Sequence, residues 1–362
     1  MRRAKSSKPR TDMHSTTSPG RALATTRASA SSDPATLLAG ALALATSAKQ
    51  VRLMGDPLQL AQVSQATHPG TSGASVLEHL LGSDATIPPD RGLFLEHTYR
   101  MHPDVSRFVS EVVYDDRLQS APECANQRVD AFGVRQLAAA FEPVAAARDG
   151  AARVPSPAAA GEGAIATPRE PSPRARGEGG PQGRMRGALT GTGLRFIPIE
   201  HQGNSQSSPE EANRIAEEIE KLLGVAAGFS PPATVTDSKG ITRRLAQTDI
   251  MVVAPYNAQV KCVAEALRGR GFPSVPVGTV DKFQGRQAEV VFFSMTTSSG
   301  DDLPRDIDFL FSRNRLNVAV SRARCLAVVV ASPRLLDVAC NTPAQMQLVN
   351  ALCRFVEMAE RF

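Results

Sequence analysis

Two arginines, Arg322 and Arg324, stand immediately before the apolar run Cys325–Ala331, inside the segment RLNVAVSRARCLAVVVASP (315–333). Such a run indicates a buried strand, so the guanidinium groups at its start need an explanation. A solvated helix face would be sufficient. Alternatively, one of them binds a phosphate, because a guanidinium stays charged and can hold two phosphate oxygens through parallel hydrogen bonds.

Other polar clusters recur along the chain, and several follow apolar runs that predict strands. APYNAQ (254–259), VGTVDKFQG (277–285) and SMTTSS (294–299) each come at or just after the end of such a run. In open α/β sheets, ligands bind beyond the carboxyl ends of the strands. We therefore expect these clusters, together with Arg322, to gather at that edge of a sheet.

The elements that must position these clusters alternate between strand and helix. Helical patterns are predicted at 72–82, 208–224, 257–269 and 343–360, and Ser208, Pro209 and Glu211 supply start signals for the second of these. Strands are predicted at 50–56, 194–200, 249–254, 277–294 around a glycine turn, and 325–331, and residues 91–118 are predicted as strand, polar turn and helix. This alternation predicts an α/β fold, with a parallel sheet covered by helices on both faces.

Composition excludes several classes of protein. The 362 residues suffice for two domains, and the five scattered cysteines predict neither a zinc site nor a disulfide framework. No apolar run is long enough to cross a membrane, and we expect a cytoplasmic protein. The net charge is +5, but residues 1–32 alone carry +6, which leaves −1 for the remainder. The basic character therefore belongs to an N-terminal tail and does not mark the ordered part as a nucleic-acid binder.

Five clusters in order, GDPLQL (55–60), TYRMHP (98–103), APYNAQ, VGTVDKFQG and NVAVSRAR (317–324), resemble the superfamily 1 helicases, in the branch that contains the Upf-one and Dna-two types. The resemblance covers about residues 37–118 and 193–362. In detail it is similar to the C-terminal region of AAA-type bacterial helicases fused to a RecB-like nuclease domain. It implies a RecA-like P-loop NTPase fold, with a complete second RecA-like domain and a remnant of the first.

The resemblance also implies a domain organisation. Residues 33–90 would be the C-terminal remnant of the first RecA-like domain, and residues 91–124 with 193–362 would form the second. Residues 1–32 are expected to be a disordered basic tail. The Pro/Gly/Arg-rich residues 125–192 are expected to be a mostly disordered insert.

By resemblance, four residues would contact ATP phosphates or adenine. Gln59 of GDPLQL would sense the γ-phosphate, Arg100 of TYRMHP would reach it from the second domain, and Arg322 would be the arginine finger. Tyr99 would stack near the adenine. The alternatives are a structural Gly-Asp turn at Gln59, a surface arginine at Arg100 and a half-buried tyrosine at Tyr99.

The same resemblance places Gly285, Arg286 and Gln287 at the nucleotide. Gly285 would let the backbone pass close to the ligand, and Arg286 would contact a phosphate. The family commonly has glutamate where Gln287 stands, so this chain lacks one negative charge there while keeping an acceptor.

On the nucleic-acid side, Pro255, Tyr256 and Thr279 match family residues that touch the strand. Tyr256 would stack on a base or hold a sugar-phosphate, and the alternative is a tyrosine that packs its own loop. Arg315 and Arg324 are expected to form structural ion pairs.

Two motifs that phosphoryl transfer requires are missing. A P-loop has the form GxxxxGK[ST], but none of the seven lysines follows a glycine, and the chain has no Asp-Glu dipeptide to bind Mg²⁺. ATP and Mg²⁺ thus belong to the intact family enzyme, and no metal site is expected in this chain. We predict a truncated gene product that alone hydrolyses ATP negligibly, so its status as an enzyme stays open.

The function expected from the resemblance is the C-terminal motor portion of an ATP-dependent DNA or RNA helicase. The alternatives are a non-enzymatic nucleic-acid-binding or regulatory module, and a non-functional gene fragment. The expected partners are single-stranded nucleic acid, with DNA favoured, and an upstream chain that carries the P-loop and a RecB-like nuclease domain. No membrane partner is expected.

Overall fold

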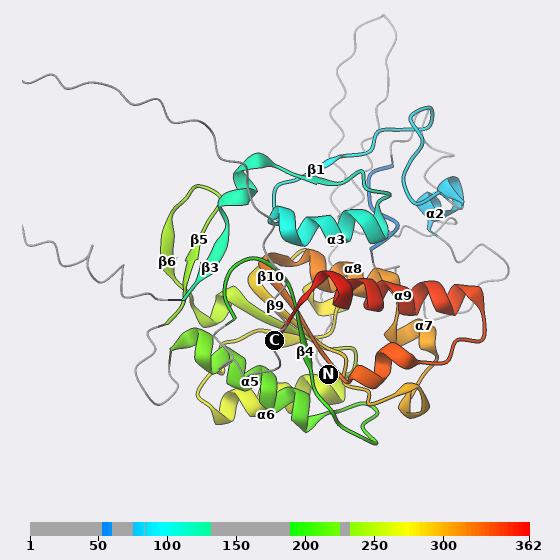
Figure 1. The fold of residues 1–362 in the computed structure, drawn as a ribbon. Helices are drawn as coiled ribbons and strands as arrows, with labels where there is room; N and C mark the ends of the chain where they lie inside the picture. The colour runs from blue at the N-terminus through cyan, green and yellow to red at the C-terminus, as the bar shows by residue number, and fades with distance from the viewer. Residues whose placement is uncertain (1–52, 60–74, 83, 132–188, 225–231) are drawn as a thin grey trace, which may run out of the picture. The chain divides into compact units, whose positions relative to one another are not determined.

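The computed structural model describes residues 53–59, 75–82, 84–131, 189–224 and 232–362 (Figure 1). The chain divides into two compact units, a first unit of residues 1–88 and a second unit of residues 89–362. The expected basic tail and most of the expected insert lie outside the described residues. Within the described ranges, no helix is long and apolar enough to cross a membrane.

The first unit contains the helix α2 (Val76–Leu81). Ser75 and Glu78 form a capping box, in which each side chain accepts a hydrogen bond from the other residue's backbone N–H. Gly82 ends the helix with a φ of +62°. A strand was predicted at 50–56, of which the structure describes residues 53–56. For these residues the prediction is wrong, because they form no strand and Met54 is exposed.

The second unit is built on a six-stranded sheet in which every pairing is parallel. The strand order is β11-β4-β10-β9-β7-β8. The long strands β9 and β10 are mostly apolar, as expected of strands that helices cover on both faces. The α/β prediction is confirmed. The strands are β4 (Gly193–Pro198), β7 (Ile250–Val253), β8 (Val277–Gly278), β9 (Ala288–Ser294), β10 (Ala323–Ala331) and β11 (Glu360–Arg361).

Helices flank this sheet on both sides (Figure 1). Two of them, α5 and α6, pack on one face, whereas α3, α8 and α9 pack on the other. The helices predicted at 208–224 and 257–269 are confirmed, and the one predicted at 343–360 is confirmed as far as Met358, since β11 begins at Glu360. The helices are α3 (Pro103–Val113), α5 (Pro209–Leu223), α6 (Asn257–Gly269), α7 (Ile307–Leu310), α8 (Arg313–Ser321) and α9 (Pro343–Met358), with short 3₁₀ turns η1 (Pro122–Asn126), η2 (Gln247–Asp249), η3 (Asp281–Phe283), η4 (Gly300–Asp302) and η5 (Pro333–Asp337).

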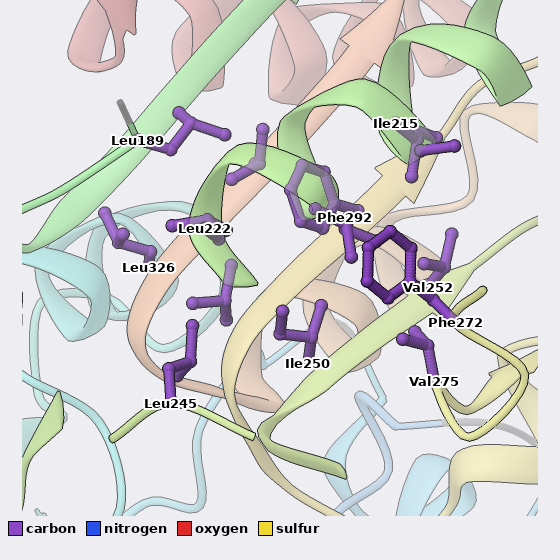
Figure 2. Close-up of a cluster of buried hydrophobic side chains, with 14 of the residues drawn as sticks. Leu189, Ile215, Leu222, Leu245, Ile250, Val252, Phe272, Val275, Phe292 and Leu326 are labelled. Carbon is purple, nitrogen blue, oxygen red and sulfur yellow. The ribbon is translucent and has the colours of Figure 1, made fainter. Parts of the chain in front are cut away.

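A hydrophobic core fills the space between the sheet and the α5–α6 layer (Figure 2). Alternate residues of β9 face this core, among them Phe292, which is fully buried. They meet Ile215 and Leu222 of α5 and Val252 of β7. Each such side chain contributes about 1.5–3 kcal/mol through burial, so this layer holds the sheet edges, and the loops on them, in fixed positions.

The strand predicted ahead of TYRMHP is nearly absent. Only β1 (His97–Thr98) pairs there, in parallel with the equally short β2 (Gln119–Ser120), and Leu93 and Leu95 are exposed. A second, antiparallel sheet consists of β3 (Arg128–Asp130), β5 (Thr234–Thr236) and β6 (Thr242–Arg244). Because β3 pairs with β5, the beginning of the expected insert is ordered.

Candidate functional site

Arg322 and Gln287 lie at the amino ends of neighbouring strands. Arg322 directly precedes β10, Gln287 directly precedes β9, and the first residues of these strands, Ala323 and Ala288, are partners in the sheet. The backbone N–H of Ala288 also donates to the carbonyl of Arg322 (3.0 Å). The expectation that Arg322 gathers with the other clusters at the carboxyl ends is therefore wrong. The reason is that Arg322 caps the C-terminus of α8, which leads directly into the start of β10.

Arg100 joins the group from a distant part of the chain. Its Nε donates to Oε1 of Gln287 (3.1 Å), and its Nη1 donates to the carbonyl of Ser321 (3.2 Å). Ser321 is the residue before Arg322, so three of the clusters meet at one place. The structure thus brings Arg100 to Gln287 and to the backbone next to Arg322, whose side chain is itself buried, at 3% exposure.

The charge at this edge is mainly positive. Burial, together with the nearby charge of Arg324, lowers the pKa of Arg100. Arg324 forms the expected structural ion pair, with Nη1 2.9 Å from Oε1 of Glu289. Burial raises the pKa of Glu289, and Arg324 partly opposes that effect. A cluster of guanidinium groups of this kind is suited to an anion such as a phosphate.

The remaining predicted nucleotide residues lie on exposed backbone close to this edge. Tyr99 is 73% exposed, which leaves its ring open to a stacking partner. Gly285 and Arg286 are exposed as well. Gly285 has a φ of +77°, and a Cβ added there would meet no atom within 4 Å. A turn conformation that favours glycine, and not a close approach to other atoms, therefore accounts for this residue in the structure.

Gln59 lies in the first unit, so the group at the amino ends of β9 and β10 is built without it. Its Nε2 donates to Oδ2 of Asp56 (2.9 Å), and the same carboxylate accepts from the backbone N–H of Leu58 (3.0 Å). These contacts form a local Asx turn. A role for Gln59 at a γ-phosphate stays a prediction.

Pro255, Tyr256 and Thr279 lie at the opposite, carboxyl edge, after β7 and β8. Pro255 and Tyr256 are buried, and Thr279 is partly exposed. The ring of Tyr256 stacks on Phe309, with centroids 5.5 Å apart and an interplanar angle of 22°. Burial raises the pKa of Tyr256. In this structure the ring is packed against its neighbour, as in the alternative that the sequence left open.

Arg315 also stands at this edge, and its expected ion pair is wrong. Its guanidinium lies over the ring of Phe309, 4.1 Å from the centroid, and Arg305 lies 4.5 Å from the same centroid. Within the described residues, no carboxylate lies within ion-pair distance of either arginine. Arg305 and Phe309 lie in a segment that matches none of the five clusters, so no motif pointed to them.

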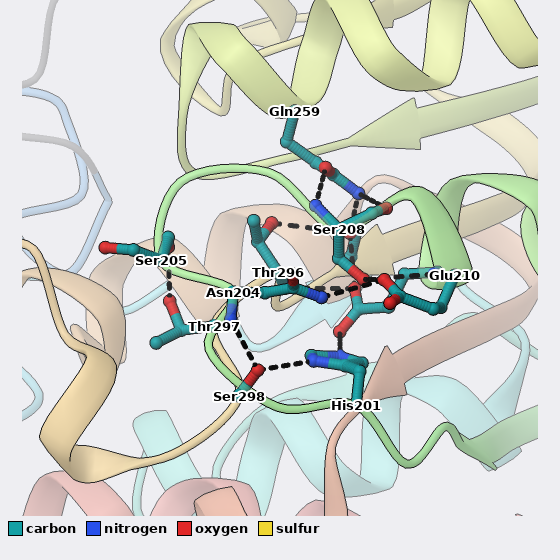
Figure 3. A network of polar contacts seen from close by, with 11 residues as sticks. His201, Asn204, Ser205, Ser208, Glu210, Gln259, Thr296, Thr297 and Ser298 are labelled. Atoms are coloured by element: carbon teal, nitrogen blue, oxygen red, sulfur yellow. Dashed lines mark hydrogen bonds and ion pairs between the residues drawn. The ribbon is translucent and has the colours of Figure 1, made fainter.

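A buried polar network at the carboxyl ends of the strands was also missed (Figure 3). The backbone N–H of Glu211 donates to the Ser208 side chain, as the capping-box pattern predicts. The Glu211 carboxylate, however, accepts from His201 Nε2 (3.0 Å), Ser294 Oγ (2.5 Å) and the backbone N–H of Thr296 (2.9 Å). The sequence pattern at Glu211 therefore predicted the start of the helix correctly. It did not reveal the buried contacts of the Glu211 side chain.

The described residues do not form a metal site. In this part of the chain, no three His, Cys, Asp or Glu side chains gather in a way that could hold a metal ion. The part of the chain that the structure describes thus offers no cluster of metal ligands, whereas the amino edge of the sheet carries guanidinium groups, which are suited to anions.

Comparison with known proteins identifies the family of the chain. A family model described as an AAA domain matches residues 73–158 and 191–334. The chain is 43% identical over 76 residues (21% of the chain) to the DNA polymerase alpha-associated DNA helicase A of Schizosaccharomyces pombe. It is 25% identical over 316 residues (85% of the chain) to the Regulator of nonsense transcripts 1 homolog of Drosophila melanogaster.

A third relative is the putative helicase mov-10-B.1 of Danio rerio, which is 30% identical over 137 residues (35% of the chain). The matched regions span only 11%, 20% and 12% of the length of these three relatives, in the order given. The fold, the order of the clusters and the matching family model lead to one conclusion. The chain belongs to this AAA domain family, within the Upf-one-like superfamily 1 helicases.

Proposed function

We propose that the chain supplies the second RecA-like domain of an ATP-dependent helicase motor, with Arg100 as a γ-phosphate contact and Arg322 as the arginine finger. The observation that carries this proposal is the convergence of Arg100 on Gln287 and on the carbonyl of Ser321. Residues 187 and 221 positions away from Arg100 meet it at one edge of the sheet. A surface arginine that binds no ligand would not need two hydrogen bonds from its guanidinium to distant parts of the chain.

The chemistry of phosphoryl transfer suits this arrangement. Most of its catalysis is positioning and charge stabilisation, and an arginine finger contributes about 10³–10⁵ in rate. Arg100 uses Nε and Nη1 for protein contacts, which leaves Nη2 for a phosphate oxygen. Gln287 accepts from Arg100 without adding a negative charge that would repel the phosphates. Tyr99, Gly285 and Arg286 would complete the contacts to the nucleotide.

The nucleic-acid strand would pass the opposite edge of the sheet, at Pro255, Tyr256 and Thr279. Residues 279–287 connect the carboxyl end of β8 to the amino end of β9, and thus run from one proposed site to the other. This short connection supports a motor in which the nucleotide state and strand contacts influence each other. Gln59 would report on the γ-phosphate from the first unit.

The P-loop and the Mg²⁺ ligands would have to come from outside these 362 residues. We infer that an upstream segment or chain provides them, with a RecB-like nuclease domain as part of the same system. DNA is the proposed strand, although the relatives include proteins named as RNA helicases and one named as a DNA helicase. By itself, the chain is expected to bind ATP weakly and to hydrolyse it negligibly.

The test is a titration of the purified chain with ATP, together with an ATPase assay with and without single-stranded DNA or RNA. We expect no turnover above background in any of these conditions. We expect ATP binding to weaken about tenfold in Arg100→Ala, the equivalent of one lost phosphate contact of about 1.4 kcal/mol. The matched control is Arg334→Ala, which removes an exposed arginine from η5 and should bind like the wild type.

Two results would contradict the proposal. Unchanged ATP binding in Arg100→Ala would remove the phosphate role of Arg100. Strand-stimulated turnover that disappears in Arg322→Ala would show that the chain makes a complete nucleotide site in another way. A non-enzymatic nucleic-acid-binding module, in contrast, would bind oligonucleotides but would show no ATP binding that depends on Arg100.

A further inference from the structure

A cavity of about 540 Å³ opens in the second unit beside Tyr256. One short segment supplies its whole lining, and this segment begins after η4 and ends in the first turn of α8. The lining residues are Arg305, Asp306, Asp308, Phe309, Ser312 and Arg315. None of these residues belongs to the group at the amino ends of β9 and β10.

Phe309 holds both arginines of this cavity in place. Their guanidinium carbons lie 4.5 Å (Arg305) and 4.1 Å (Arg315) from the ring centroid, and Tyr256 stacks on the same ring. A guanidinium that lies over an aromatic ring keeps its N–H donors available at its edge. The stack therefore presents two fixed sets of donors.

These donors have no carboxylate partner within ion-pair distance among the described residues. Asp306 and Asp308 line the same cavity, yet neither pairs with Arg305 or Arg315. Arginines with a purely structural role would be expected to take the nearest carboxylates, as Arg324 does with Glu289. Two arginines that are held in place and left unpaired beside a cavity are suited to an anionic ligand with several acceptor oxygens.

We propose that this cavity binds a phosphodiester group of single-stranded nucleic acid, with Arg305 and Arg315 as its ligands. The identity of the strand rests on the function proposed above, because the cavity adjoins Tyr256 at the strand-binding edge. The stack of Tyr256 on Phe309 positions the two guanidinium groups, so Tyr256 contributes to strand binding without touching a base. The carboxylates of Asp306 and Asp308 weaken the attraction between the two guanidinium groups and the phosphodiester without removing it.

The test measures the affinity of the whole chain for two labelled oligonucleotides of about 15 nucleotides, one of thymidine and one of uridine. Fluorescence anisotropy gives this affinity at salt concentrations between about 50 and 200 mM. Arg305→Ala and Arg315→Ala should each weaken binding about tenfold. Each should also reduce the slope of log affinity against log salt by about 0.7, the value for one phosphate contact on a single strand. Arg334→Ala serves as the matched control, with no change in either quantity.

Asp308→Asn separates a binding role from damage to the fold. If Asp308 opposes the phosphate, this variant should bind several-fold more tightly, and a misfolded protein would not show such a gain. Arg305 is exposed, so its replacement should leave the melting temperature unchanged. The proposal would be overturned if Arg305→Ala and Arg315→Ala bound the oligonucleotides like the wild type and Asp308→Asn bound them no more tightly. The proposed helicase function would stand in that case.

Two further arms separate the possible sources of the phosphate group. Inorganic phosphate at constant ionic strength should not displace the oligonucleotide at low millimolar concentration, and complete displacement would assign the cavity to a free phosphate ion. If the wild-type chain binds neither oligonucleotide at the lowest salt, the nucleic-acid part of the proposed function fails and this proposal fails with it.

Discussion

At the scale of single residues, the contact between Arg100 and Gln287 shows how a departure from the family pattern acts. The amide oxygen of Gln287 orients the guanidinium at 3.1 Å, as a carboxylate would, but it does not neutralise the charge. Because burial and Arg324 already lower the pKa of Arg100, this edge of the sheet carries positive charge without a full counter-charge. An anionic ligand would relieve that imbalance.

His102, two residues after Arg100, provides a test of pH dependence. Its Nδ1 accepts the backbone N–H of Asp104 and so caps α3. Burial lowers the pKa of His102 below its ordinary value of 6.5, although Asp104 acts in the opposite direction. Between the lowered pKa and 6.5, the unfolded chain binds more protons than the folded one, so the free energy of unfolding falls as pH falls. This contribution should be fully present above pH 6.5.

Denaturant unfolding measured from pH 8 to about pH 5 checks this expectation, since the unperturbed imidazole titrates in that interval. His102→Asn keeps a capping side chain and removes the titration, so its stability should depend less on pH than that of the wild type. His97→Asn replaces an exposed histidine of β1 and is the control. If both variants keep the wild-type pH dependence, His102 is not the group responsible.

At the scale of elements, the sequence predicted correctly those segments whose secondary structure depends only on the spacing of their own apolar residues. Helix α6 was predicted at 257–269 and is found there, because its apolar spacing defines it locally. The strand predicted ahead of TYRMHP failed, because a strand needs a partner and only the two residues of β2 pair with it. Strand pairing is a long-range property, and a local apolar run such as GLFLE does not reveal it.

The Glu211 network carries a prediction about how the carboxyl edge is held. Glu211→Ala removes an acceptor that His201, Ser294 and Thr296 share, and leaves those groups buried without it. We expect a loss of about 3 kcal/mol in the free energy of unfolding. Glu210→Ala is the matched control, because it removes the adjacent, exposed carboxylate from the same first turn and should cost about 1 kcal/mol or less.

Urea unfolding of both variants gives the comparison. Similar losses in the two variants would show that the buried network adds nothing beyond the general effect of an acidic first turn. A loss confined to Glu211→Ala would show that contacts between α5, the loop after β4 and the loop after β9 hold the carboxyl edge of the sheet in place.

At the scale of the whole molecule, the sequence could not show at which end of the sheet each cluster lies. Of the residues it named, Arg100 and Gln287 contact each other and Arg100 reaches the backbone next to Arg322, but Arg322 was expected at the carboxyl ends of the strands. A sequence can show that a helix precedes a strand. It does not show at which end of the sheet the residues that join the helix to the strand will lie, because that depends on the fold. The cavity at Phe309 was missed for a related reason, because stacking between Phe309 and Tyr256 joins segments 53 positions apart.

The division into two units also predicts unequal stability along the chain. In the first unit, α2 buries Val76 and Leu81 but leaves Leu80 51% exposed. In the second unit, every residue of β9 is buried between helical layers. Local unfolding free energies range from near zero to the global value according to such burial. Backbone amides of α2 should therefore exchange with solvent at least about 100-fold faster than those of β9, a difference of about 2.7 kcal/mol in opening free energy. Native-state hydrogen exchange with mass spectrometry measures both, and equal or slower exchange in α2 would show that the first unit is stabilised by more than its described contacts.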